Sequence, residues 1–165
     1  MAENNGIAKM PDYRTIVQKT GAAYIPLVEK QISNGGSVDL YQHLCMENAL
    51  TMMHETAVGA GLEGISALQK SEIMQILQQV ATLRLNAFSR PRECYFQTRK
   101  KKQPDGNWTT SIEMGIEGDG NDVILRNFGH GVEEVYPYWD VHVDDEFTYP
   151  VHHGIDVEPP TWKRC

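Results

Sequence analysis

Long hydrophobic runs are absent from this chain of 165 residues. No apolar stretch approaches the roughly 18 residues that a membrane-spanning helix requires. The first residues also lack the basic and then apolar pattern of a secretory signal. These two absences argue against the integral membrane and exported classes, so we expect a protein that has no membrane partner and works in the cytoplasm.

Cysteine is also scarce, with three residues at Cys45, Cys94 and Cys165. An odd number at wide spacing, without a Cys-x-x-Cys pair, provides neither a disulfide framework nor a zinc motif. This usage is typical of a reducing compartment. Cys45 and Cys94 lie in apolar contexts, and we expect both to be buried core residues.

Basic residues are fewer than acidic ones: the chain has 15 Lys and Arg residues and 22 Asp and Glu residues, which gives a net charge of −7. A uniformly acidic chain would repel nucleic acid, but this charge is unevenly distributed. Basic residues gather between positions 90 and 102, where Glu93 is the only acidic residue, whereas Arg126 is the only Lys or Arg between positions 113 and 158. At physiological salt, charges influence one another over about 8 Å. A basic strip on an acidic body can therefore still attract phosphate.

Recognisable catalytic and metal-binding motifs are missing. The chain has no His-Glu-x-x-His, no Gly-x-Ser-x-Gly and no Cys-His zinc pattern, each of which would place a ligand or nucleophile at a fixed spacing. Glycines between positions 59 and 64 have no preceding strand and no following Lys-Ser/Thr, so they predict an interhelical linker. The second half still leaves a metal-dependent nuclease, or another nucleic-acid-processing enzyme, open as an alternative. The residues concerned are His130, Asp140, His142, Asp144, Asp145, Glu146, His152 and His153.

The most informative stretch runs from residue 71 to residue 129. Ser71 predicts a helix N-terminus with Glu72 in the first turn, and Pro91 predicts the end of that helix. The apolar residues between them mostly follow helical spacing and indicate a buried face. They are Ile73, Ile76, Leu77, Val80, Leu83 and Leu85.

A long-looped hairpin is predicted next. Residues 94–98 are strand-like and lead into the basic run 99–102, while Pro104, Asp105, Gly106 and Asn107 have turn chemistry. Residues 108–116 return as the second arm, with alternating apolar positions. Residues 118–128 then predict a short helix that ends at Gly129.

The flanking regions complete an α+β fold with N-terminal helices, a basic β-hairpin, a core helix and a small antiparallel sheet. Residues 1–11 predict a disordered leader, and residues 12–165 one domain. Asp12 or Thr15 could cap a first helix that includes Tyr13, Ile16 and Val17, and residues 22–32 then have a helical face. Residues 34–36 predict a break, and residues 38–58 a further helix. The alternation of residues 139–144 predicts a strand, Asp144-Asp145 a turn, and residues 146–149 a second strand of a β-meander.

The order of these segments resembles the RecT family of phage and prophage single-strand annealing proteins. The resemblance covers roughly residues 65–163 and lies in the order and spacing of short motifs. The matching positions are Cys94-Tyr95, Arg99–Lys102, Met114-Gly115, Arg126–Gly129, Val141–Phe147 and Gly154–Pro160. Two features depart from the family pattern. Ile116-Glu117-Gly118 replaces a Tyr-x-Gly, and the chain stops at Cys165 where family members continue, which predicts a C-terminally incomplete member.

The resemblance implies ATP-independent binding of single-stranded DNA and annealing of complementary strands in homologous recombination, without bond chemistry and without a cofactor. It implies homo-oligomers along DNA, a phage exonuclease and the host single-strand-binding protein as partners, and a bacterial host cytoplasm. The hairpin would form one wall of a groove that holds DNA. The residues that we expect to bind DNA, by resemblance or by charge, are Arg84, Gln97, Arg99, Lys100, Lys101, Lys102, Trp108, Arg126 and Asn127.

Each of these residues also has a plainer explanation. A basic run on a hairpin can serve solubility alone, and Trp108 can pack against the hairpin as readily as it can stack on a base. Arg126 suits a helix C-terminus through the helix dipole alone. An interaction module without a nucleic-acid role therefore stays open as a third interpretation, which salt-dependent binding would separate from the first.

Overall fold

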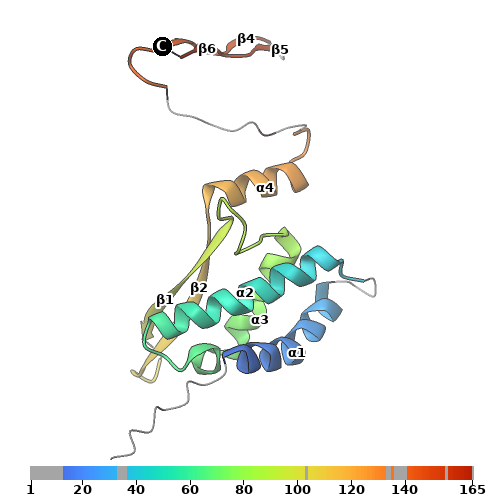
Figure 1. Cartoon of the computed structure of the whole chain (residues 1–165), viewed down its shortest axis with the longest axis vertical. Coiled ribbons are helices and arrows are strands. Elements are labelled where there is room, and N and C mark those ends of the chain that lie inside the picture. Colours follow the sequence, from blue (N-terminus) through green and yellow to red (C-terminus); the bar gives the residue numbers. More distant parts are fainter. Residues whose placement is uncertain are drawn as a thin grey trace, which may run out of the picture. The chain divides into compact units, whose positions relative to one another are not determined.

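The computed structural model describes residues 13–32, 37–102, 104–132, 135, 141–154 and 156–164. The chain divides into two compact units, residues 1–133 and residues 134–165. Helices and small antiparallel sheets are both present, so the predicted α+β class is confirmed (Figure 1). The predicted leader and the predicted break at residues 34–36 lie outside the described residues.

The helical body of the first unit comprises α1 (Tyr13–Ile32), α2 (Leu40–Gly59), the short 3-10 helix η1 (Gly64–Ala67) and α3 (Lys70–Leu83). α2 packs against α1, η1, α3 and the hairpin, so it lies at the centre of the core. α1 is one continuous helix that includes Pro26, and Thr15 lies within it and not at its cap. Among the described residues, no helix is long and apolar enough to cross a bilayer.

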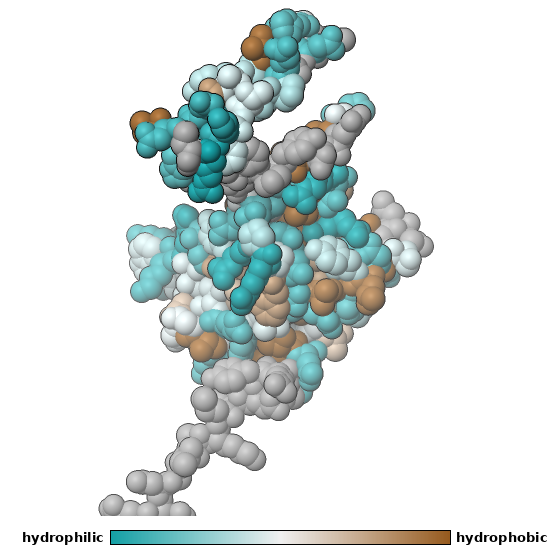
Figure 2. Space-filling model, turned by 45° about the horizontal axis from the view of Figure 1, so that its top comes forward, coloured by the Kyte–Doolittle hydropathy of each residue, from teal (hydrophilic) through white to brown (hydrophobic). Residues whose placement is uncertain are grey.

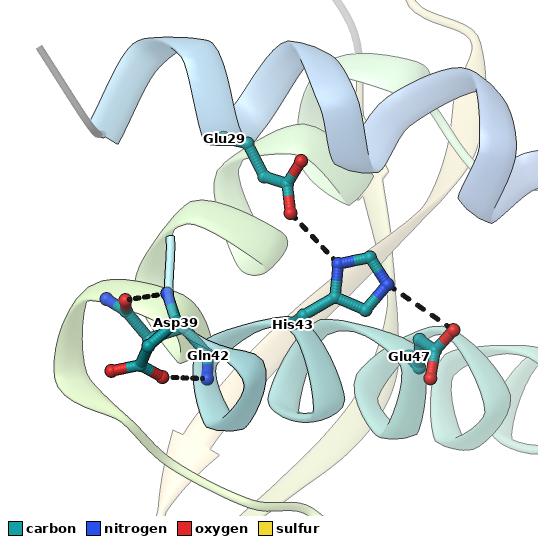
Figure 3. A network of polar contacts seen from close by, with 5 residues as sticks. All are labelled: Glu29, Asp39, Gln42, His43 and Glu47. Atoms are coloured by element: carbon teal, nitrogen blue, oxygen red, sulfur yellow. Dashed lines mark hydrogen bonds and ion pairs between the residues drawn. The ribbon is translucent and has the colours of Figure 1, made fainter. Parts of the chain in front are cut away.

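Polar contacts fix how α1 and α2 meet. Asp39 and Gln42 form a capping box at the start of α2, in which each side chain accepts from the other residue's backbone N–H. This arrangement satisfies donors that a helix N-terminus leaves unpaired. His43 lies between two carboxylates, with Nδ1 at 2.9 Å from Glu29 of α1 and Nε2 at 3.5 Å from Glu47 (Figure 3). One imidazole therefore links the two helices.

The bounds of α3 differ from the prediction at both ends. The helix begins one residue before Ser71, because the carbonyl of Gln69 accepts from Glu72 and Ile73 and Gln69 is the N-cap. It ends at Leu83 and not near Pro91, because Arg84 takes a left-handed conformation (φ 58°) that interrupts the helix. Leu85 is buried as predicted but lies beyond the helix.

The predicted hairpin is confirmed; its second strand has the predicted bounds, and its first strand is longer than expected. β1 (Cys94–Lys102) pairs antiparallel with β2 (Trp108–Ile116), from Cys94 opposite Ile116 to Lys102 opposite Trp108. The basic run therefore lies in a strand, where the prediction placed it in a loop after residue 98. At the other end of the hairpin, Cys94, Phe96 and Ile112 are buried in the core.

α4 (Gly118–Phe128) follows β2 directly and ends before Gly129, as predicted. Its start is fixed to the hairpin, since Glu117 donates a backbone hydrogen bond of 3.0 Å to Glu93. Gly120 approaches Glu93 so closely that a Cβ there would lie 1.9 Å from the Glu93 carbonyl oxygen. Gly120 is the only buried residue of α4. α4 therefore lies at the surface of the first unit, with Val123 and Ile124 packed against the core.

The second unit contains four short strands, β3 (Glu146–Thr148), β4 (Val151–His153), β5 (Asp156–Glu158) and β6 (Thr161–Lys163), within its described residues. β3 pairs with β6 and β4 with β5, so the strands are nested and the predicted β-meander is wrong. Both ladders share one register, in which Pro150 falls opposite Pro159. Proline has no backbone N–H to donate, which explains why one hairpin is interrupted there.

The predicted strand at residues 139–144 is not found among its described residues. Val141 and His142 are irregular, and Val143 and Asp144 form a turn in which the Val143 side chain is fully exposed. The local reason is that Asp145 accepts from the backbone N–H of His142, which closes the turn. The turn predicted at Asp144-Asp145 is confirmed.

The molecular surface is predominantly polar. On the face seen in Figure 2, hydrophobic side chains form small, separate patches in a largely hydrophilic surface. Several large hydrophobic residues are nevertheless exposed in the first unit, on α2, on the hairpin and on α4. Such positions matter when they lie close together, because contiguous exposed apolar surface often marks a binding site.

Candidate nucleic-acid interface

A rigid turn closes the basic end of the hairpin. Gly106 takes a positive φ of 86°, which the turn requires and other residues rarely adopt. The Asp105 carboxylate accepts from the backbone N–H and the side-chain Nδ2 of Asn107, both at 3.0 Å. The backbone bond from Asn107 holds the pKa of the Asp105 carboxyl below its ordinary value. The turn residues predicted from the sequence therefore lie where the chain reverses.

Strand geometry divides the basic run between two faces. Successive side chains of a strand point to opposite sides, and paired residues of an antiparallel ladder share a side. Lys102 lies opposite Trp108 and Lys100 opposite Thr110, so these four residues occupy one face. Arg99 and Lys101 belong to the other face. We name the first set (Lys100, Lys102, Trp108 and Thr110) the tryptophan face.

Trp108 is 65% exposed. This side chain therefore does not pack in the core of the first unit. A shallow hollow of about 360 Å³ adjoins it and is lined by Lys100, Trp108, Thr109 and Thr110. An exposed indole beside an ammonium group is a combination that can take the flat face of a base next to its phosphate.

The opposite face is electrostatically different. Arg99 forms an ion pair with Glu113 at 2.8 Å between Nε and Oε2, and Gln97 lies opposite Glu113 in the ladder. Lys101 contributes to a polar hollow of about 320 Å³ between β2 and α3, which also includes Glu72 and Glu113. Carboxylates therefore offset the positive charge on this face. No ion pair joins Lys100 or Lys102 to another of the described residues.

Three predicted residues lie elsewhere. Arg84 pairs with Asp39 and stacks over the Tyr41 ring at 5.5 Å, so it stabilises the start of α2 and the end of α3. Arg126 and Asn127 are exposed in the last turn of α4. α4 begins at the end of the hairpin opposite its tip (Figure 1). Nine-residue strands span about 30 Å, so these residues do not join the tryptophan face.

The described histidines and carboxylates of the second half do not converge. Among the described residues, no group of three or more His, Cys, Asp or Glu side chains could hold a metal ion. Asp145 accepts from His142 and from the indole of Trp162, and His153 lies 3.8 Å from Glu158. These contacts are structural within the small sheets. Asp140 lies outside the described residues.

Neither described cysteine has the environment of a nucleophile. Cys45 and Cys94 are both fully buried, as predicted. Burial raises the pKa of the Cys45 thiol to about 12 and that of Cys94 to about 11, and the nearby Glu93 carboxyl adds to both shifts. A thiol reacts as its thiolate, so these two groups are inert at neutral pH.

Two residues near the interface were missed by the sequence reasoning. Thr110 lies on the tryptophan face. If the loop is taken as the five residues between Lys102 and Trp108, the register of the hairpin places Thr110 opposite Lys100. Glu72 accepts a hydrogen bond of 3.1 Å from the backbone N–H of Ile112 at the outer edge of β2. No local pattern predicts that contact, because its partners are 40 residues apart.

Comparisons with known proteins add no identification. No family model matches the chain, and neither a curated protein nor a solved structure matches it. The resemblance to the RecT family therefore stays a hypothesis that depends on the residues themselves.

Proposed function

We propose that the tip of the β1–β2 hairpin binds single-stranded nucleic acid through its tryptophan face. The observation that carries this proposal is the position of the exposed Trp108 directly opposite Lys102 and next to Lys100. Base–aromatic stacking is sequence-tolerant because every base has a π-face. Duplex DNA offers few such faces, since its bases are stacked on one another, so the indole favours single strands.

The two lysines supply the phosphate contacts. Lys100 and Lys102 are two residues apart on one strand, which separates their backbones by about 6.6 Å. They can therefore contact neighbouring phosphates of an extended strand while the indole engages a base. Neutralised phosphates release counterions, which gives affinity that is independent of sequence and falls with salt.

Annealing is the activity that we propose for this binding, following the resemblance to the RecT family. A strand held by its phosphates keeps the pairing edges of its bases accessible to a complement. Base pairing then supplies about 1.4 kcal/mol per step, so the reaction needs neither ATP nor a metal. In this proposal further copies of the chain bind along the strand, and a phage exonuclease and the host single-strand-binding protein act beside it.

The test is binding of a fluorescent oligothymidylate across a salt series, with EDTA present. The wild-type chain is compared with Lys100→Ala/Lys102→Ala and with the matched control Arg99→Ala/Lys101→Ala, which removes the same charge from the opposite face. We expect the first variant to lose most of the affinity and of the salt dependence, and the second to lose much less. Mixing with the labelled complement then measures annealing.

Other outcomes discriminate between the remaining interpretations. Equal losses of affinity in the two variants would contradict binding through the tryptophan face alone. Oligonucleotide shortening that requires added magnesium would assign a nuclease instead. A wild-type chain that binds no oligonucleotide at low salt would leave the interaction module as the better interpretation.

A further inference from the structure

Two surfaces among the described residues of the first unit expose apolar side chains. The first is a groove between α1 and α2. It consists of two adjoining hollows of about 500 Å³ and 680 Å³, which share Val17, Gln18 and Thr51 and therefore form one continuous channel along both helices. Val58, 39% exposed, lines its far end. We name this channel the α1–α2 groove.

The second surface is a ridge on α4. Leu125 and Phe128 are 45% and 53% exposed, and Val132 just beyond the helix is 37% exposed. We name these three residues the α4 ridge. Val123 and Ile124, by contrast, pack against the core. α4 is thus fixed to the hairpin by one side and presents apolar side chains on another.

We propose that the α4 ridge of one copy of this chain binds in the α1–α2 groove of a second copy. An amphipathic helix enters a hydrophobic groove with apolar anchors one turn apart. Leu125 and Phe128 have the i, i+3 spacing on α4, and Val132 follows three residues after the C-cap Gly129. The groove offers apolar surface to such anchors at Val17 and Val58.

The charges beside the two surfaces support the same occupant. Arg126 follows the first anchor and is the one basic residue of α4. Glu47 and Glu55 line the groove, and both are exposed. Arg126 is the cation that α4 of a second copy would bring to this carboxylate-lined groove, while the two aspartates of the helix, Asp119 and Asp122, precede the anchors. The proposal predicts an ion pair between Arg126 and Glu55 of neighbouring copies.

The contact is head-to-tail, because the ridge and the groove are different surfaces. Such a contact joins each copy to two neighbours and generates either a ring or an open filament. It uses no residue of the tryptophan face. Failure of this proposal and failure of the proposed nucleic-acid binding are therefore distinguishable.

The experiment is sedimentation velocity of the full chain over a concentration series, without nucleic acid. The ridge variant is Leu125→Glu/Phe128→Glu, the groove variant is Val58→Glu, and Leu27→Glu is the control, because Leu27 is 52% exposed on α1 and does not line the groove. We expect wild type and control to assemble with concentration and each of the two variants to be monomeric. Circular dichroism verifies that each variant is folded.

Mixing the two variants gives the decisive result. Each retains one intact surface, so an equimolar mixture should form dimers that grow no further. Wild type that is monomeric at every concentration, or a mixture that stays monomeric, would overturn the proposal. So would a ridge variant that is monomeric beside a groove variant that assembles, since this would indicate a symmetric contact of α4 with itself. Arg126→Glu should weaken assembly, and adding Glu55→Arg in the same chain should restore it.

Discussion

The two ends of the β1–β2 hairpin share a backbone ladder and differ in nearly everything else. At the base, Cys94 and Phe96 are buried beneath α2 and α3, and Glu93 is tied to α4. At the tip, Lys100 and Lys102 are exposed and face Thr110 and Trp108. The first residues of β1 therefore belong to the core, and its last residues are exposed to solvent.

This difference shows how a small core can position the exposed hairpin tip at a distance from it. The nine-pair ladder continues past the last buried pair, so the tip is positioned by backbone hydrogen bonds and by its turn. Residues at the tip are consequently available for binding at little cost to folding. The predictions below test this separation between base and tip.

The largest effect is expected at the base. Phe96→Ala removes a buried ring and should lower the free energy of unfolding by about 3–5 kcal/mol. Lys100→Ala, four residues along the same face, should change it by no more than about 0.5 kcal/mol. Urea denaturation, followed by the circular dichroism signal of the helices, measures both changes in the free energy of unfolding. Equal effects would show that the tip also contributes to the core.

Thiol labelling provides a second test of the base. With its pKa raised to about 11, Cys94 should react with iodoacetamide on the order of a hundredfold more slowly than an ordinary thiol at pH 8, and Cys45 more slowly still. Two additional thiols per chain should be labelled when urea is added. Mass spectrometry reports the count, and rapid labelling of Cys94 in the native chain would contradict a closed base.

At the tip, Trp108→Ala should weaken single-strand binding by about 1–3 kcal/mol per stacked base and leave the free energy of unfolding nearly unchanged. Trp162→Ala is the matched control, because that indole donates to Asp145 in the second unit and is half-buried there. Fluorescence anisotropy with an oligothymidylate gives the comparison. If both substitutions weaken binding equally, the tip has no special role.

A smaller effect is expected from the face opposite Trp108. Glu113→Gln removes the carboxylate that pairs with Arg99, so the local potential becomes more positive and binding should tighten a few-fold at low salt. The gain should vanish at high salt, because exposed charges are screened. Glu158→Gln in the second unit, a matched loss of one exposed carboxylate, should produce no such gain.

The smallest expected effect is on thermal stability. It concerns the ion pair between Arg84 and Asp39, far from the hairpin tip. Hydrogen bonding from Gln42, and then from Arg84, holds the pKa of the Asp39 carboxyl below its ordinary value of 3.8. A depressed pKa stabilises the fold above the unfolded value and loses this contribution as the pH falls through the folded value. Asp39→Asn should therefore lower the melting temperature slightly at pH 7 and not at pH 2, as thermal denaturation would measure.

Local patterns predicted much of the first unit. The turn at Pro104–Asn107 and the helix before Gly129 follow from residues whose backbone preferences are strong, and both lie where expected. The end of α3 did not follow, because Arg84 is left-handed and its side chain contacts Asp39 and Tyr41, which are 45 and 43 residues away and give no local signal. The separation of the four basic residues into two faces required knowing that the strand continues through Lys102.

The second unit was predicted less well for a different reason. Apolar and polar residues alternate from Trp139 to Asp144, as in a half-buried strand. In the described part of this segment, however, a hydrogen bond from His142 to Asp145 closes a turn instead. The pairing of β3 with β6 depends on residues 13 to 17 positions apart, and short strands give a weak signal for such pairing.

The opposed prolines of the second unit have a consequence for solubility. Pro150 and Pro159 divide one hairpin into ladders of three pairs each, and neither proline can donate an N–H to a newly arriving strand. An exposed pair of strands is otherwise a template on which identical chains can stack into fibrils. This interruption limits the length over which such stacking can proceed. We therefore expect Pro150 and Pro159 to reduce the tendency of this unit to aggregate.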